Sequence, residues 1–513
     1  MSVAPLTRLA GTTFLSTLPT NSFLLLLGAA LPVDLHLSSL EPASRINTDS
    51  IEFLLLMALL FTFYLGMTVL LQRQPIDDGY KKYLRWMLIG AALVGTIYVL
   101  APALLSRDAF VYAGYGRVIV AHSANPYYTP LAAFPHDPLF TLDDWRTAIA
   151  AYGPLWLLVC AISTWISGSA VLPYVFFFRV LGLLAHLCNI ALIATILSHM
   201  KRSPRIILTG TLLYALNPLV LLESSLGAHN DTAMVTCLLL GILLTLRAEQ
   251  NAFQHTFPVL APVIPFTAAV LIKFTAAPLL AFYVVLLSFH LLRADTSLPV
   301  KQRLRMILSR GIGVCLFASS LVLVAYTPLW LGHTVRDMLT SFAAPPSSRL
   351  AFGSILLALQ KVVASQSHPN ALLAILSLHN TWNIINLVSM LLLFIVCAAW
   401  LWYHPTTQTL MYSSLAILGV LLVVTPWFFP WYVIWLVGLA APCFSDQTTR
   451  TGYALLAGAI TFSASALFIY LFRNDPPIGG WVGAICLTTI GPPLVVFLLA
   501  LARRQQSRKH LNI

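Results

Sequence analysis

One short segment of the chain holds the side chains best suited to acid–base and phosphate chemistry. If this segment is helical, Asp108, Tyr112 and Tyr115 fall at positions i, i+4 and i+7, which puts a carboxylate and two phenols on one face. Arg107 and Arg117 flank that face. A carboxylate can take a proton from a hydroxyl group, and an arginine can hold a phosphate. The pattern therefore indicates transfer of a group from a phosphate to a hydroxyl. The alternative interpretation is that these residues are only interfacial aromatic side chains with a charge pair.

A second polar group follows in a very short turn, Gly227-Ala-His-Asn-Asp. Its side chains His229, Asn230 and Asp231 could bind sugar hydroxyls or a phosphate. The same pattern could instead be a helix C-cap at Gly227, with Asn or Asp capping the next helix. Both interpretations can hold together. Glu223, about one turn earlier, is expected to pair with an arginine of the same face.

Two basic residues and one aromatic motif complete the candidate set. Lys273 lies inside the long apolar stretch 257–292, where it either snorkels to the interface or contacts a lipid phosphate. Arg179, at the start of another apolar stretch, is a similar candidate. The motif around Trp427 and Trp431 serves either as an interfacial anchor or as a stacking platform for an acceptor sugar.

The elements that must position these residues are membrane helices. The 513 residues are 59% hydrophobic and only 9% charged, which excludes a water-soluble globular enzyme and a disordered chain. We predict an all-α protein that crosses the bilayer about 14 times, as a single domain over residues 1–513, with both termini in the cytoplasm. The expected spans are 12–33, 51–72, 84–105, 173–198, 207–225, 232–247, 257–272, 275–292, 306–330, 384–403, 408–425, 431–445, 452–472 and 481–502.

The distribution of charge sets the expected topology. The net charge of +12 arises mostly from short basic loops and the tail, which is the pattern of the positive-inside rule and not of a nucleic-acid-binding surface. Residues 106–172 and 331–383 then form two outer loops. This arrangement requires the apolar residues 152–168 to lie in the outer leaflet as an interfacial helix, because a further span would invert every later basic loop.

An ordered set of motifs resembles those of C-type glycosyltransferases, multi-span enzymes that use polyprenyl-phosphate sugars. The motifs are Ser106-Arg-Asp-Ala-Phe-Val-Tyr-Ala-Gly-Tyr-Gly-Arg, Ser123-Ala-Asn-Pro-Tyr, Tyr152-Gly-Pro-Leu, Asn217-Pro-Leu-Val-Leu-Leu-Glu, Gly227-Ala-His-Asn-Asp, Leu271-Ile-Lys-Phe and Thr425-Pro-Trp-Phe-Phe-Pro-Trp-Tyr. The set is most similar to that of bacterial polyprenyl-phosphomannose-dependent α-mannosyltransferases. Each motif alone is weak, but their order extends along most of the chain.

The resemblance implies a single inverting displacement at the outer face of the cytoplasmic membrane, with Asp108 as the catalytic base. The implied partners are a polyprenyl-phosphate sugar donor, with mannose as the expected sugar, and a glycan or glycolipid acceptor. Arg107, Arg117, Lys273 and Arg179 are then candidates for holding the donor phosphate. Candidates for binding sugar or acceptor are Tyr112, Tyr115, Asn125, Tyr152, His229, Asn230, Asp231, Trp427 and Trp431.

Two further expectations complete the sequence-based hypothesis. Many relatives carry a paired acid where this chain has Arg107 before Asp108, so the sequence does not support a divalent metal here, and no cofactor is expected. The alternative functions are a flippase or transporter for lipid-linked oligosaccharides, and a structural scaffold. A transporter should hold its charged residues near the membrane midplane, whereas the candidates here gather near the outer boundary.

Overall fold

The fold was analysed in a computed structural model of the full chain, which describes residues 48–73, 76, 79–101, 105–253, 255–294, 299–337, 351–445, 449–472 and 486–502. The expected first span, 12–33, and part of the second outer loop lie outside the described residues. The described residues are mainly helical, and an isolated parallel β-bridge joins Phe352 to Trp427. The expectation of an all-α fold is confirmed.

The helices follow the apolar stretches of the sequence. The first part of the chain forms α3 (Thr48–Arg73), α4 (Tyr80–Leu100), α5 (Asp108–Val120), η1 (Leu131–Ala133), α6 (Pro154–Ser167), α7 (Val171–His199), α8 (Pro204–Ala215), α9 (Pro218–Leu221), the π-helical turn η2 (Leu222–Leu226) and α10 (Asp231–Gln250). The middle forms α11 (Thr256–Leu260), α12 (Val263–Ile272), η3 (Phe274–Ala276), α13 (Ala277–Ala294), α14 (Val300–Trp330), α16 (Ile355–Ala364) and α17 (Ala371–Leu376). The last part forms α18 (His379–Tyr403), α19 (Thr407–Val424), η5 (Pro430–Tyr432), α20 (Val433–Ala440), η6 (Ala441–Cys443), α21 (Arg450–Ser465), α22 (Phe468–Phe472), η7 (Cys486–Ile490) and α24 (Gly491–Ala502).

Not every expected span is a full-length helix. Within the described residues, nine helices are long and apolar enough to cross a membrane. The expected span 207–225 is a bent pair, α8 followed by α9 and η2, with an angle of 51° that would make a tenth span. The expected spans 257–272, 431–445 and 481–502 coincide with shorter apolar helical segments. The protein is therefore a multi-pass helical membrane protein.

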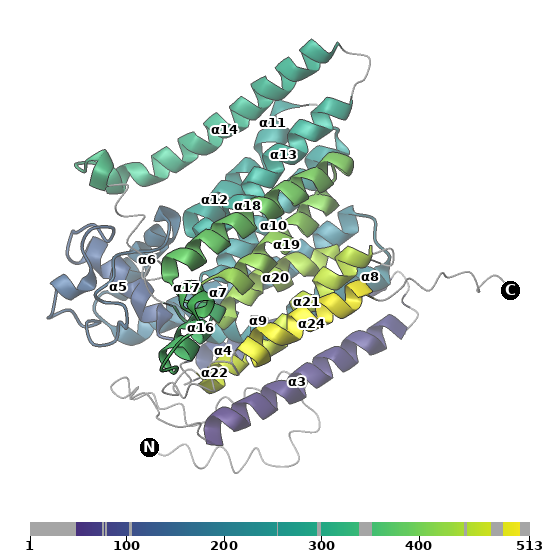
Figure 1. The fold of residues 1–513 in the computed structure, drawn as a ribbon. Helices are drawn as coiled ribbons and strands as arrows, with labels where there is room; N and C mark the ends of the chain where they lie inside the picture. Colours follow the sequence, from purple (N-terminus) through teal and green to yellow (C-terminus); the bar gives the residue numbers. More distant parts are fainter. Residues whose placement is uncertain are drawn as a thin grey trace.

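The two expected outer loops meet at one end of the helix bundle. In Figure 1 the long helices run side by side, with α14 along one edge and α3 along the opposite edge. The helices α5, α6, α16 and α17 gather at the same end, whereas α8 and the start of α14 lie toward the other end. That 106–172 and 331–383 share one side of the membrane stays a prediction.

The segment from α5 to α6 forms a compact substructure at this end. The 14-residue helix α6 is shorter than the roughly 20 residues that a span needs. It packs closely against α5. A Cβ atom at Gly116 of α5 would lie only 2.1 Å from the carbonyl oxygen of Cys160 in α6, so only glycine allows this approach. This geometry fits the expected non-spanning helix at 152–168. It fixes α5, and therefore Asp108, against the end of the bundle.

Candidate active site

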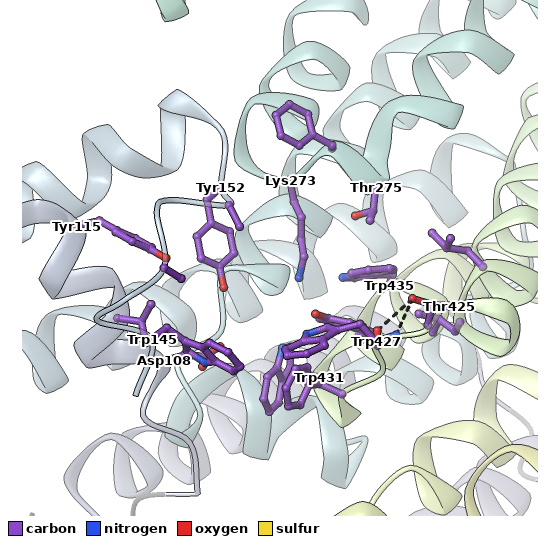
Figure 2. A pocket seen from close by; sticks show the side chains of 18 residues that line it. Asp108, Tyr115, Trp145, Tyr152, Lys273, Thr275, Thr425, Trp427, Trp431 and Trp435 are labelled. Atoms are coloured by element: carbon purple, nitrogen blue, oxygen red, sulfur yellow. Dashed lines mark hydrogen bonds between the residues drawn. The ribbon is translucent and has the colours of Figure 1, made fainter. Parts of the chain in front are cut away.

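A cavity of about 280 Å³ opens where the segment from α5 to α6, named the outer substructure here after its expected side of the membrane, meets the bundle. Four segments line it: the first turns of α5, the loop before α6, the break between α12 and α13, and the chain from the end of α19 into α20. Asp108 and Lys273 are the charged residues of its lining, and most other lining residues are aromatic. In Figure 2 the Lys273 side chain extends between the rings of Tyr152 and Trp435, toward the part of the cavity that Asp108 and Trp431 line. The cavity thus brings together a carboxylate, an ammonium group and aromatic rings that are far apart in the sequence.

Asp108 is the first residue of α5, where the helix dipole favours a negative charge. Its backbone N–H donates to the hydroxyl of Ser106 at 3.2 Å, and the Tyr112 hydroxyl donates to its Oδ2 atom at 3.4 Å. The expected helical face is therefore present. Asp108 and Tyr115 line the cavity, while Tyr112 is fully buried behind them against Trp156.

His229 is placed between Asp108 and a second carboxylate. Its Nδ1 atom lies 3.2 Å from Asp108 Oδ2, and its Nε2 atom lies 3.3 Å from Glu223 Oε2. The imidazole also stacks on Trp431 at a centroid distance of 3.8 Å. Burial alone would lower the pKa of His229, but the two carboxylates outweigh burial and raise this pKa to about 9. The imidazole is therefore held as a cation.

The turn that carries His229 contains one of the expected caps, because Gly227 is the C-cap of η2 and its N–H donates to the Leu222 carbonyl at 3.0 Å. Gly227 has an ordinary φ of −68°, and Ala228 occupies the left-handed region with φ of 59°. The N–H of His229 closes the turn by donating to the carbonyl of Glu223 at 3.2 Å. The side chain of Asn230 does not cap α10. Gly227 is needed for space instead, because a Cβ there would lie 2.7 Å from Glu223 Oε2 and 2.9 Å from His229 Nε2.

The sequence-based expectation of an arginine partner for Glu223 was wrong. Within the described residues Glu223 contacts His229, and its Oε1 atom accepts a hydrogen bond of 2.5 Å from the Tyr470 hydroxyl. The π-helical turn places this fully buried carboxylate under the 227–230 turn. Such turns interrupt α-helices frequently at functional sites.

Lys273 ends α12 and points into the cavity (Figure 2). Its ammonium lies 2.7 Å from Asp231 Oδ1, and 4.1 Å and 5.0 Å from the ring centroids of Tyr432 and Trp435. The Trp435 indole N–H donates to the same Asp231 oxygen at 2.6 Å. Lys273 therefore does not snorkel away from the site; it is bound to a buried carboxylate and two rings.

The aromatic candidates line the same cavity. Tyr152 is positioned by Gly153, whose N–H donates to the Ile272 carbonyl at 3.1 Å and whose Cα packs against Leu271 too tightly for a Cβ. Trp427 and Trp431 contribute rings from the opposite side. Trp431 is sandwiched between His229 and Phe429, with a centroid distance of 4.4 Å to the latter.

Two candidate phosphate ligands serve the outer substructure instead. Arg117 donates to Asp137 at 2.6 Å and to the Gly168 carbonyl at 2.7 Å, and it does not line the cavity. Burial alone would raise the pKa of Asp137, but the Leu139 N–H, Arg117 and His122 lower it. Arg107 pairs with Asp144 at 3.0 Å, also outside the lining. Both arginines are bound to acids that the sequence analysis did not connect to them.

The remaining candidates also bind backbone or lie apart from the lining. Arg179 donates to the carbonyls of Val99, Ala101 and Leu226, where two helical segments end. These hydrogen bonds satisfy carbonyl oxygens within the apolar bundle. Asn125 donates to the Leu329 carbonyl at 2.5 Å and thereby ties the outer loop to the end of α14. Asn230 is buried beside His229, with no hydrogen bond from either side-chain polar atom.

The sequence analysis did not single out three residues of the lining that matter for the geometry: Trp145, Phe274 and Trp435. Tyr432 was expected, because it ends the aromatic motif that contains Trp427 and Trp431. Trp435 follows Trp431 by one helical turn, a spacing that places two rings on one face. Phe274 ends the Leu271-Ile-Lys-Phe motif and could have been included on that basis, whereas Trp145 has no comparable signal in the sequence. In the part of the chain that the structure describes, no group of three or more His, Cys, Asp or Glu side chains could hold a metal ion.

The fold and the cavity define a class: a multi-pass helical membrane protein with a carboxylate and an ammonium facing each other across an aromatic cavity at one end of the bundle. Residues 20–289 match the family described as "Alpha-(1->6)-mannopyranosyltransferase, N-terminal domain". This match covers more than half of the chain. The chain belongs to this family, which confirms the resemblance to C-type glycosyltransferases.

Individual relatives match over shorter stretches. Alpha-(1->6)-mannopyranosyltransferase A of Mycobacterium tuberculosis is 30% identical over 220 residues, which are 40% of this chain and 39% of the relative. The protein of the same name from Corynebacterium glutamicum is 28% identical over 187 residues, 36% of each chain. The chain thus matches less than two fifths of the length of either relative.

Solved structures of an archaeal enzyme resemble the chain more distantly. The oligosaccharyltransferase AglB of Archaeoglobus fulgidus, in complex with an inhibitory peptide and a dolichol-phosphate, aligns with a TM-score of 0.39 and 14% identity. The alignment covers 83% of this chain and 56% of that one. The apo form of the Archaeoglobus fulgidus oligosaccharyltransferase aligns with a TM-score of 0.36 and 13% identity.

Proposed function

We propose that this protein transfers a mannosyl residue from a polyprenyl-phosphate donor to a hydroxyl group of a glycan or glycolipid acceptor. The observation that carries this proposal is the cavity in which Asp108 faces Lys273 across aromatic rings. Family membership supports the choice of mannose and of an α-(1→6) bond, since both belong to the family's description.

The proposed reaction is a single inverting displacement. The acceptor oxygen forms a bond to the anomeric carbon while the bond from that carbon to the donor phosphate oxygen breaks, and the electron pair leaves with the phosphate. The proton of the acceptor hydroxyl passes to Asp108. A positioned base of this kind contributes roughly 10²–10⁴ in rate.

Lys273 is the proposed ligand of the departing phosphate. It is the basic residue of the lining, and its ammonium lies against the rings of Tyr432 and Trp435. Arg107, Arg117 and Arg179 do not belong to this proposed donor site, because their guanidinium groups bind acids and carbonyls outside the lining. Tyr152, Trp427 and Trp431 supply ring surfaces for sugar.

We further propose that this end of the bundle faces outward from the cytoplasmic membrane. The support is the basic character of the loops assigned to the opposite side, since cytoplasmic loops carry an excess of Lys and Arg. A flippase or transporter would be expected to hold its charged groups near the middle of the bundle, whereas Asp108 and Lys273 belong to a cavity bordered by the outer substructure.

The test is transfer by the purified protein in lipid nanodiscs. Radiolabelled polyprenyl-phosphate mannose is supplied with a panel of mannosyl acceptors, and the product is analysed for labelled α-(1→6)-mannose. GDP-mannose serves as the control donor, and the Asp108→Asn variant as the control protein. Transfer from the lipid donor alone is expected; equal transfer by the variant, or none from any lipid donor, would contradict the proposal.

A further inference from the structure

A buried chain of polar groups runs from the cavity into the bundle. It starts at Asp108, continues through both nitrogens of His229 to Glu223, and ends at the hydroxyl of Tyr470. The chain links the outer helix α5, the turn 227–230, the π-helical turn η2 and helix α22. His229 and Glu223 are each at most 1% exposed. Neither residue lines the cavity, so neither is available to bind substrate directly.

We propose that His229 is a positioning residue, an imidazolium clamped by Glu223 that fixes the orientation of the Asp108 carboxylate toward the acceptor hydroxyl. This inference rests on the proposed function and extends it to the groups behind the base. The Asp108 side chain is partly exposed to the cavity, at 15%, and has two single bonds about which it can rotate. The imidazolium and the Tyr112 hydroxyl both contact Oδ2, which restricts that rotation.

The surroundings of His229 suit this role. Its two charged neighbours are Asp108 from α5 and Glu223 from η2, and the ring of Trp431 from η5 covers one face of the imidazole. A buried cation between two carboxylates is held in place by both, and the stacked ring leaves it little freedom to turn. Tyr470 in turn fixes Glu223 through Oε1, leaving Oε2 facing the imidazole.

The inference makes the pH dependence of turnover informative. The carboxylates hold His229 protonated up to a pH of about 9, so kcat should decline above that pH as the imidazolium loses its proton. Glu223→Gln removes one of the two negative charges. The pKa of His229 then falls, and the alkaline decline of kcat should move to lower pH.

Gly227→Ala provides a test that removes no charged group. The added methyl would lie within 3 Å of both Glu223 Oε2 and His229 Nε2, so these two groups must separate. The backbone at Gly227 has a φ that alanine adopts readily. Gly90→Ala in α4 is the matched control, because a Cβ atom there meets nothing within 4 Å. We expect a kcat about 10-fold lower for Gly227→Ala and an unchanged kcat for Gly90→Ala.

The closing experiment measures kcat and both KM values from pH 6 to 10 for the wild type and three variants in nanodiscs. His229→Gln should lower kcat by about 10- to 100-fold, keep both KM values within twofold and lose the alkaline decline. Glu223→Gln should shift that decline by at least one pH unit. His186→Gln is the control, because His186 is equally buried but contacts the Ala215 carbonyl; its pH profile should match that of the wild type.

Failure of the inference and failure of the proposed function are distinguishable. If the wild type transfers mannose but His229→Gln and Glu223→Gln retain its pH profile, the inference is overturned and the proposed function stands. If the wild type transfers nothing from any lipid donor, the proposed function fails and the role assigned to His229 fails with it. A loss of thermal stability in His229→Gln without any change in kcat or its pH profile would assign His229 a purely structural role.

Discussion

Replacement of Lys273 by methionine should affect both binding of the donor and stability of the fold. The change keeps most of the aliphatic side chain and removes the ammonium that lies 2.7 Å from Asp231. Asp231 is fully buried, and Lys273 is 13% exposed. The variant therefore leaves a buried carboxylate with the Trp435 N–H as its hydrogen-bond donor, and we expect both lower stability and weaker use of the lipid donor.

The two effects have different expected sizes. Removing one partner of a buried ion pair costs about 3–5 kcal/mol, and the partial exposure of Lys273 places the cost near the lower end, at about 3 kcal/mol. A hydrogen bond to a charged group contributes about 1.5–3 kcal/mol. If Lys273 binds the donor phosphate, its loss should raise the donor KM roughly 10- to 150-fold. The acceptor KM should change by less than about twofold.

The double variant Lys273→Met/Asp231→Asn distinguishes the two roles. It removes both charges while leaving an amide oxygen to accept the Trp435 N–H, so most of the lost stability should return. The donor KM should remain high, because no ammonium is restored. Thermal unfolding in nanodiscs measures stability, and initial rates over a range of donor concentrations measure KM. Recovery of a wild-type donor KM by the double variant would show that Lys273 only neutralises Asp231, which would refute its assignment to the phosphate.

Three further predictions follow from the same geometry. Asp108→Asn should reduce turnover by at least about 100-fold with normal expression and thermal stability, because the amide cannot accept a proton; a variant that keeps more than about a tenth of wild-type turnover would exclude Asp108 as the base. In a background with Cys188 and Cys315 replaced by alanine, a cysteine at Ser123, near Asn125, should react with a membrane-impermeant reagent added to intact cells, and one at Arg205, near Ser203, should not; labelling of both would overturn the proposed topology. Burial raises the pKa of Asp143 to about 7, so its contribution to stability is complete below the unfolded pKa near 3.8 and is lost as the pH rises through about 7. Asp143→Asn should therefore raise the unfolding temperature relative to wild type at pH 8 but not at pH 4, and an equal shift at both pH values would contradict the burial argument.

The membrane class of this protein was determined by composition and hydropathy alone. A helix in a bilayer must satisfy its own backbone and present apolar side chains, so each long span leaves a continuous apolar stretch in the sequence. For this reason the ranges around α3, α4, α7 and α18 agree with the structure to within a few residues. The interfacial placement of 152–168 also rests on the sequence, because a further crossing there would move the later basic loops to the outer side, and it stays a prediction.

The helical face at Asp108 was likewise accessible from the sequence. Its residues are close in sequence, and the spacing of Asp108, Tyr112 and Tyr115 determines their relative directions once the segment is helical. The proximity of Lys273 and Trp431 to this face was inferred only through family resemblance. The structure supports it through a shared cavity.

The partners of the charged groups were decided by tertiary structure. Arg117 and Lys273 look alike in the sequence, as single basic residues near candidate motifs. The first binds Asp137 within the outer substructure, and the second crosses to Asp231 and the cavity. Likewise, Glu223 meets His229 and Tyr470 only because a π-helical turn, a bend of 51° and the approach of α22 bring them together. Hydropathy and local spacing indicate the environment of each side chain and the direction in which it points. Which carboxylate pairs with a given cation depends instead on how helices that are distant in the sequence pack together. No single segment of the sequence contains that information.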